Sequence, residues 1–180
     1  MRRPTGTRAR LDSSRQARRA VAPSLRATSV KALLQRVSKA SVRVAGDTVG
    51  SIGPGLCVLV GVGDDDADDD AARLARRVPD LRLFEDDEGK TNRSLADTGG
   101  SVLAISQFTL LADTRRGRRP SFNGAARPDV AEPLFERFVA GLREAGVDVA
   151  TGRFGAHMDL EISADGPLTI LIDTKEARRA

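Results

Sequence analysis

The stretch VLAISQFTLLADT, residues 102–114, reads as a buried β-strand that ends in polar side chains. Ser106, Gln107 and Thr109 interrupt its apolar run. Burying an unpaired hydroxyl or amide costs about 1–3 kcal/mol on mutational scales. These groups are therefore either paired inside the protein or turned toward a ligand that uses them.

Strand patterns flank this stretch on both sides. Strands are expected where apolar and polar residues alternate, or where a short apolar run is bounded by turn residues. Residues 56–62, LCVLVGV, are apolar throughout and bounded by glycine, which predicts a strand buried on both faces. The other predicted strands are residues 31–37 paired with 40–46, then 47–52, 81–84, 147–154, 157–163 and 167–173.

Two main helices are predicted between these strands. The first covers residues 71–78 and follows DDDADDD (64–70), whose aspartates suit a helix start better than a cation site. The second begins after Pro128 and has apolar positions every fourth residue, at Val130, Leu134, Phe138 and Leu142. The order of elements predicts a mixed α/β fold with a largely antiparallel, barrel-like sheet. A parallel dinucleotide-binding fold is not expected, because GVGDDD lacks the glycine fingerprint.

The net charge of +4 comes from the N-terminal segment. Residues 1–29 carry eight Arg and one Asp, a charge of +7, so the rest of the chain carries −3. We expect a disordered basic extension at 1–29, a folded domain at 30–175 and a short tail at 176–180. Three interpretations of the extension stay open: a transit peptide, a basic arm for RNA, or a mis-set start with Val30 as the true first residue.

Composition narrows the possible chemistry. The single cysteine, Cys57, lies in an apolar run and is expected to be a buried, unreactive thiol in a cytoplasmic protein. No apolar run reaches the length of a membrane span. The single histidine, His157, is expected to face solvent, and no Cys/His cluster suits zinc. We expect no metal and no cofactor, so an enzyme of this composition would use positioned backbone N–H groups on a reactive ester.

Several motifs together resemble the D-aminoacyl-tRNA deacylase (D-Tyr-tRNA deacylase) family. They include SQFTL (106–110), RRPSF (118–122), TGRFGAHM (151–158) and DGPLT (165–169). GSIGPGL (50–56) and LRLFEDDEGK (81–90) agree with the same family, and the likeness covers about residues 31–173.

The resemblance implies a homodimeric, chirally selective hydrolase. Such an enzyme cleaves the ester between a D-amino acid, or glycine, and the 3′ end of tRNA. The implied catalytic residues are Ser106, Gln107, Phe108 and Thr109. The implied substrate-binding residues are Gly166, Pro167, Met158 and Phe154. Gly166-Pro167 is implied to be a cis dipeptide, delivered from the partner subunit, whose backbone would collide with an L side chain.

For the polar strand end, we expect backbone N–H groups near Phe108 and Thr109 to hold the ester carbonyl. Ser106 and Gln107 would hold the terminal ribose or adenine, with Gln107 and Thr109 on alternate faces of the strand. A threonine nucleophile needs a base, which only His157 could provide, so we favour attack by water assisted by the ribose 2′-OH.

The chain departs from the family pattern at a few positions. Ala164 and Leu168 replace the usual Asn and Val around Gly-Pro, which removes a hydrogen bond expected to brace that loop. Thr91 and His157 stand where the family often has Met and Asp. Two alternatives therefore remain, an inactive dimer that binds tRNA ends and a small-ester esterase. The basic residues 115–122 could contact tRNA phosphates or form a solvated loop.

Overall fold

The computed structural model describes residues 30–174, and residues 1–29 and 175–180 lie outside the described residues. The predicted extension and tail fall there. The strands are β1 (Lys31–Val44), β2 (Asp47–Ile52), β3 (Gly55–Gly61), β4 (Arg82–Glu85), β5 (Thr91–Ser94), β6 (Ser101–Ser106), β7 (Val149–Thr151) and β8 (Asp159–Asp173). The helices are α1 (Asp68–Asp80), the one-turn α2 (Leu95–Thr98), the 3-10 turn η1 (Phe108–Leu111) and α3 (Pro128–Glu144).

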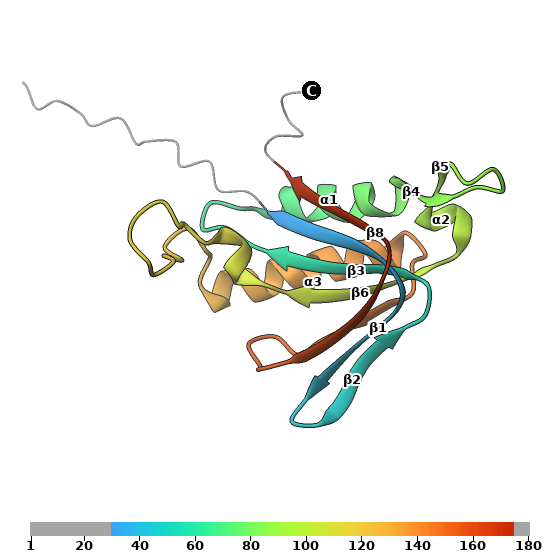
Figure 1. Ribbon diagram of the computed structural model, residues 1–180. Coiled ribbons are helices and arrows are strands. Elements are labelled where there is room, and N and C mark those ends of the chain that lie inside the picture. The colour runs from blue at the N-terminus through green and yellow to red at the C-terminus, as the bar shows by residue number, and fades with distance from the viewer. Residues whose placement is uncertain (1–29, 175–180) are drawn as a thin grey trace, which may run out of the picture.

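The main sheet has the order β2-β1-β3-β6-β7, and β8 pairs with β1. Pairing is antiparallel around β1 and parallel between β3, β6 and β7. β1 carries β8 along one edge, and its other edge pairs first with β3 and then with β2. This division of one long strand between two neighbours curls the sheet into a partial barrel (Figure 1). The predicted mixed α/β fold is confirmed.

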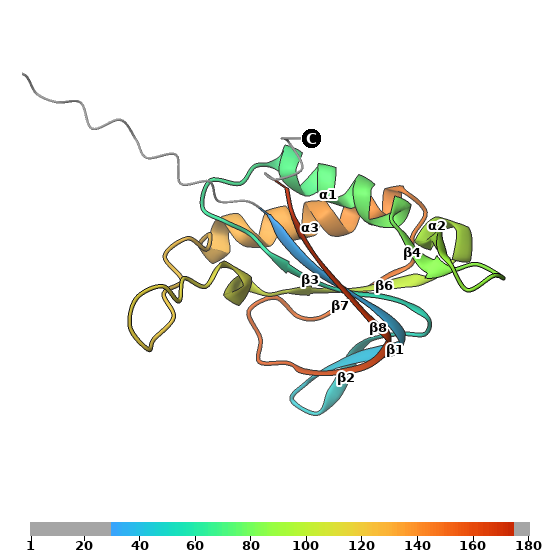
Figure 2. The same ribbon diagram turned by 45° about the horizontal axis from the view of Figure 1, so that its top comes forward.

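Helices α1 and α3 lie side by side over one face of the sheet (Figure 2). Their close approach depends on small residues, because a Cβ on Gly141 would lie 2.7 Å from the Cβ of Ala75. The buried positions of α3 are Ala131, Leu134, Phe135, Phe138, Val139 and Leu142. Val130 was predicted to belong to the apolar stripe, but it is 40% exposed because the buried face of the helix begins one residue later.

Two predicted strand pairs are single long strands. Residues 31–37 and 40–46 were expected as separate strands, but β1 runs through the exposed Ser38 and Lys39 without a turn. Residues 157–163 and 167–173 were likewise expected as two strands, and β8 unites them. Ala164 pairs with Val37 and Thr169 with Gln35, so residues 165–168 bulge out of the strand.

Other local predictions hold. β3 is buried along almost its whole length, and Asp68, Asp69 and Asp70 form the first turn of α1. Cys57 is fully buried, and burial raises the pKa of its thiol to about 12. No helix within residues 30–174 has the length and hydropathy needed to cross a membrane.

Candidate functional site

A cavity of about 540 Å³ opens beside the end of β6. This volume lies within the usual range for small-molecule sites. One wall is formed by the strand end and η1, another by the loop before α3, and a third by the segment that precedes β8. Its lining is mostly apolar and includes Val62, Ile105, Ser106, Gln107, Phe108, Phe122, Ala125, Ala126, Pro128, Ala131, Phe154, Gly155, Ala156, His157, Met158 and Leu160.

The polar strand end forms the inner corner of this cavity. β6 stops at Ser106, and the Gln107 N–H still donates to the Val60 carbonyl at 2.7 Å before the chain turns into η1. The predicted placement of Gln107 and Thr109 on alternate faces is therefore wrong, since residues two apart share one face even in an extended strand. In the structure the two side chains meet across the start of the turn, with Gln107 Nε2 donating to the Thr109 hydroxyl.

The turn leaves two backbone donors available. The N–H groups of Phe108 and Thr109 have no backbone acceptor within residues 30–174, since the first bond of the turn runs from Leu110 N–H to the Gln107 carbonyl. Unpaired N–H groups at such a turn must bond water or a ligand. Adjacent donors at a cavity wall can stabilise the negative charge that develops on an ester carbonyl.

Gly61 allows the turn to lie against β3. A Cβ at this position would lie 2.5 Å from Leu111 Cδ2 and 2.9 Å from the Gln107 carbonyl oxygen. Only a hydrogen therefore fits between β3 and the turn. The sequence analysis counted Gly61 only as a member of the apolar run 56–62 and assigned it no role.

An aromatic pair stands at the mouth of the cavity. The rings of Phe108 and Phe122 meet edge to face with centroids 5.1 Å apart, and they are 53% and 37% exposed. Exposed aromatic faces beside a pocket suit stacking with a nucleobase. Phe122 belongs to RRPSF, so this motif and SQFTL meet at one place.

The opposite wall contains two residues that the sequence assigned to substrate binding. Phe154 packs against Phe135 of α3 with centroids 6.4 Å apart, and it also borders the cavity. Met158 lines the cavity as well, and Gly152 gives it room because a Cβ there would lie 2.5 Å from its sulfur. His157 lies at the rim with its side chain 95% exposed, 4.0 Å from Asp159, as predicted for a solvent-facing residue.

Gly166 and Pro167 lie outside the cavity of their own chain. Neither residue lines it, although the peptide between them is cis as the resemblance implied. They belong to the bulge of β8 and are exposed. The structure therefore brings Ser106, Gln107, Phe108, Phe154 and Met158 together around one cavity, places Thr109 beside them, and leaves Gly166-Pro167 apart.

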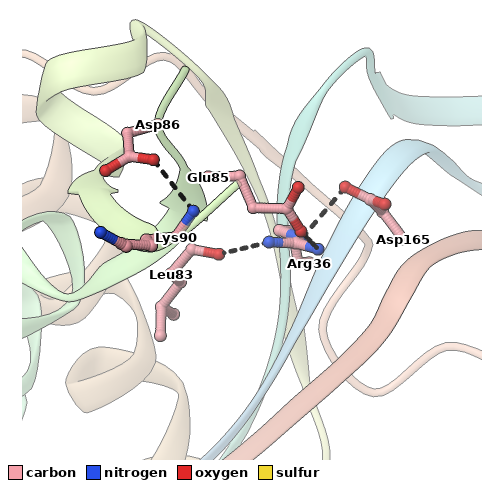
Figure 3. Close-up of polar contacts among 6 residues, drawn as sticks. All are labelled: Arg36, Leu83, Glu85, Asp86, Lys90 and Asp165. Atoms are coloured by element: carbon pink, nitrogen blue, oxygen red, sulfur yellow. Dashed lines mark hydrogen bonds and ion pairs between the residues drawn. The ribbon is translucent and has the colours of Figure 1, made fainter. Parts of the chain in front are cut away.

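A buried arginine holds this bulge in place (Figure 3). The Arg36 side chain is 6% exposed, and its Nε lies 3.0 Å from Asp165 Oδ2. Its other nitrogens donate to the Leu83 carbonyl at 2.8 Å and to Glu85 Oε1 at 3.2 Å. Arg36 thus connects β1, β4 and the residue that precedes Gly166. Sequence reasoning missed Arg36, because a lone arginine in an alternating strand gives no sign that it is buried.

The described residues contain no cluster of three or more His, Cys, Asp or Glu side chains suited to a metal ion. Two aspartates at the start of α1 accept hydrogen bonds from nearby backbone N–H groups. Asp66 Oδ2 accepts the Gly63 N–H at 2.6 Å, and Asp70 Oδ2 accepts the Ala67 N–H at 3.3 Å.

The chain is similar to deacylases throughout its described part. The family model for D-Tyr-tRNA(Tyr) deacylase matches residues 33–173. A D-aminoacyl-tRNA deacylase of Symbiobacterium thermophilum is 56% identical over 147 residues, which cover 82% of this chain and 97% of the relative. The enzyme of the same name from Thermus aquaticus is 54% identical with the same coverage.

Solved structures give the same picture. The c-Myc DNA Unwinding Element Binding Protein superimposes with a TM-score of 0.75 at 37% identity, covering 79% of this chain and 97% of its own. A probable eukaryotic D-amino acid tRNA deacylase shares the fold at 21% identity, with a TM-score of 0.71 and coverage of 81% and 99%. The chain belongs to the D-Tyr-tRNA(Tyr) deacylase family and is a hydrolase of the deacylase class, as its motifs predicted.

Proposed function

We propose that this protein hydrolyses the ester bond that joins a D-amino acid to the 3′ end of tRNA. The observation that carries the proposal is the apolar cavity lined by Phe108, where the N–H groups of Phe108 and of the adjacent Thr109 have no backbone acceptor within residues 30–174. The cavity can hold the terminal aminoacyl-adenosine, with Ser106 and Gln107 offering polar groups to its ribose or base. Family membership supports the same reaction.

The reaction needs little from side chains. Water attacks the acyl carbon, the bond from that carbon to the ribose oxygen breaks, and a proton passes to the released oxygen. The N–H groups of Phe108 and Thr109 stabilise the oxyanion that forms on the way. The neighbouring 2′-OH of the ribose assists the water, and the Thr109 hydroxyl, which is bonded to Gln107, has a positioning role.

We further propose that Gly166-Pro167 of a partner subunit completes the site and rejects L-amino acids. Pro167, Thr169 and Leu171 follow the alternation of β8 on its exposed face, where Leu171 is 58% exposed and pairs with Leu33. Leu33 pairs in turn with Leu59, so an apolar row crosses three strands on the sheet face that lacks helices. A second copy covering this row would receive Gly166-Pro167.

Rejection of L-amino acids by the backbone of Gly166-Pro167 has a consequence for the range of substrates. A backbone wall against the α-carbon blocks an L side chain and leaves room for a D side chain or a hydrogen. Glycine therefore passes the same filter, and mischarged glycyl-tRNA is a proposed second substrate. We assign this activity to a domain at residues 30–175. We also assign the protein to the cytoplasm, because the free thiol of Cys57 fits a reducing compartment.

The decisive experiment compares D-Tyr-tRNA with L-Tyr-tRNA as substrates of the purified protein in the presence of EDTA. Rapid hydrolysis of the D form alone is the expected result. Hydrolysis of neither form would favour an inactive module that binds tRNA ends. Hydrolysis of both would show that Gly166-Pro167 does not act as a chiral filter, and activity on simple esters without RNA would favour an esterase.

A further inference from the structure

A loop rich in arginine is attached directly to the mouth of the cavity. Residues 114–120 are closed at their base by Asp113 and Ser121, whose backbones exchange hydrogen bonds of 2.7 and 2.9 Å. The next residue is Phe122, which lines the cavity and meets Phe108. The loop therefore has a fixed starting point beside the aromatic pair.

The loop concentrates positive charge in an otherwise acidic body. Residues 30–174 contain 23 Asp and Glu against 18 Lys and Arg, a net charge of −5. Four of those 18 basic residues fall within positions 115–119, around Gly117, and all four are exposed. The four arginines repel one another, so the partner that this cluster favours is an anion.

Only one of these arginines is neutralised. Arg115 forms a two-pronged contact with Asp113, from Nε at 2.9 Å and Nη2 at 2.7 Å. The hydrogen bonds from Arg115 hold the pKa of the Asp113 carboxyl well below its usual range, so the pair stays ionic. Arg116, Arg118 and Arg119 have no ion pair or hydrogen bond to any part of the chain that the structure describes.

We propose that Arg116, Arg118 and Arg119 bind backbone phosphates of the tRNA acceptor end, just upstream of the terminal adenosine. This inference rests on the proposed function, because the cavity fixes where the 3′ end lies. Guanidinium groups contact phosphate oxygens with two parallel hydrogen bonds. The exposed rings of Phe108 and Phe122 at the base of the loop favour RNA over an acidic protein, since they offer a base something to stack on.

The test compares a loop variant with a matched control. The loop variant is Arg118→Gln with Arg119→Gln. The control is Arg76→Gln with Arg77→Gln, which removes the same charge from two exposed arginines of α1, a helix that contributes nothing to the cavity lining. Each protein is assayed on D-Tyr-tRNA and on 3′-O-(D-tyrosyl)adenosine, which carries the ester without a phosphate.

We expect the loop variant to lose roughly tenfold in kcat/KM on D-Tyr-tRNA, mainly through KM, because two phosphate contacts disappear. The slope of log(kcat/KM) against log salt should become shallower by about 1.4, or about 0.7 for each single-strand phosphate contact. Hydrolysis of the adenosine ester should stay unchanged, and the control should match wild type on both substrates. An equal loss in loop variant and control, or a parallel loss on the adenosine ester, would overturn the proposal.

A binding measurement separates this inference from the proposed function. Binding of uncharged, fluorescently labelled tRNA is followed by anisotropy and needs no catalysis. If the wild type hydrolyses neither substrate but binds tRNA more tightly than the loop variant, the proposed reaction is refuted. The same result supports the proposal that the loop binds phosphates. Unchanged tRNA binding by the loop variant would overturn the proposal that the loop binds phosphates. So would a competition experiment in which duplex DNA or polyglutamate displaces the labelled tRNA as well as unlabelled tRNA does.

Discussion

Gly61 determines how closely the turn η1 can approach the sheet. Its missing side chain leaves space for Leu111 and for the Gln107 carbonyl, which would lie 2.5 and 2.9 Å from a Cβ. The Gln107 carbonyl belongs to the backbone and cannot rotate away. Any side chain at position 61 must therefore move η1, and the N–H groups of Phe108 and Thr109 move with it.

We expect Gly61→Ala to lower kcat on D-Tyr-tRNA by roughly 100-fold, the scale associated with a 1 Å misplacement of catalytic groups. The matched control is Gly53→Ala, because a Cβ there meets nothing within 4 Å. Steady-state kinetics and thermal melting of both variants make the check. Normal kcat for a folded Gly61→Ala protein would show that the turn position does not matter.

Thr109 tests the identity of the nucleophile. Its hydroxyl is exposed and accepts a hydrogen bond from Gln107, and no basic side chain activates it. Thr109→Ala should therefore keep kcat within roughly threefold of wild type, as expected for the loss of one exposed hydrogen bond. Rapid quench and mass spectrometry give the comparison. Complete loss in Thr109→Ala, with an acyl-enzyme trapped on the wild type but not on the isosteric Thr109→Val, would assign the nucleophile to the hydroxyl itself.

For single residues, the sequence predicted which residues belong to the candidate site better than it predicted where their side chains point. The polar residues of SQFTL left two interpretations open, pairing inside the protein or facing a ligand, and the family resemblance favoured the ligand. The placement of Gln107 and Thr109 on alternate faces failed because residues two apart share one face of a strand. The turn at Phe108–Leu111 was missed as well, since nothing in the local pattern distinguishes the last strand residue from the first residue of a 3-10 turn. Gly61 and Arg36 escaped notice because their roles depend on partners that are distant in sequence.

Among the elements, β8 is one long strand that a bulge divides into two halves. Its two halves are both paired with β1, and the bulge at 165–168 lies between them opposite Arg36. The sequence predicted two strands and a turn there, because DG and GP are turn formers. Tertiary pairing with an unusually long β1 overrode that local preference. Ala164 has no side-chain hydrogen-bonding group, and the contact that ties the bulge to β1 is the ion pair between Arg36 and Asp165.

The brace can be tested with a conservative exchange. Arg36→Lys keeps the charge but cannot reach Leu83, Glu85 and Asp165 together, so we expect a loss of about 1–3 kcal/mol in unfolding free energy. We also expect a fall in the ratio of D-Tyr-tRNA to L-Tyr-tRNA hydrolysis, because Gly166 follows Asp165 directly. Chemical denaturation and paired rate measurements report the two effects.

Arg43→Lys is the control for this exchange. Arg43 also joins β1 to β8, through Glu161 at 2.8 Å, but the two side chains are 42% and 63% exposed. Such a surface pair contributes only about 0–1 kcal/mol. Chiral selectivity should stay at the wild-type level in Arg43→Lys. An unchanged D-to-L ratio in Arg36→Lys would show that the contacts of Arg36 do not affect chiral selectivity.

For the whole molecule, the proposal of a site shared between two chains depends on where the cavity and Gly166-Pro167 lie in one chain. The cavity lies at the end of β6, whereas Gly166-Pro167 lies on the leucine-bearing face of the sheet. The sequence could predict the curled fold, since its strand and helix patterns are strong, but the separation of these two parts depends on three-dimensional pairing. It became visible only when β8 was placed against β1.

Mixed dimers distinguish sites shared between chains from sites contained in one chain. Gly61→Val damages the cavity, and Gly166→Val damages the bulge, where φ is +114° and a Cβ would lie 3.0 Å from the Leu168 nitrogen. Each variant alone should be nearly inactive. Equal amounts, dissociated and re-paired, should regain about a quarter of wild-type activity, because half of the dimers then hold one intact site. Failure to regain activity, although size-exclusion chromatography and mass spectrometry show mixed dimers, would place both parts in one chain.

The aromatic pair at the cavity mouth also offers a place for a fluorescent probe, because the protein has almost no fluorescence of its own. The chain contains six Phe but no Trp and no Tyr, so excitation at 295 nm finds no intrinsic fluorophore in it. A single Phe122→Trp exchange would place the only indole of the molecule 5.1 Å, ring to ring, from Phe108 in the native arrangement, at the point where the substrate enters. Binding and release of the tRNA 3′ end could then be followed as a change in the fluorescence of the introduced tryptophan.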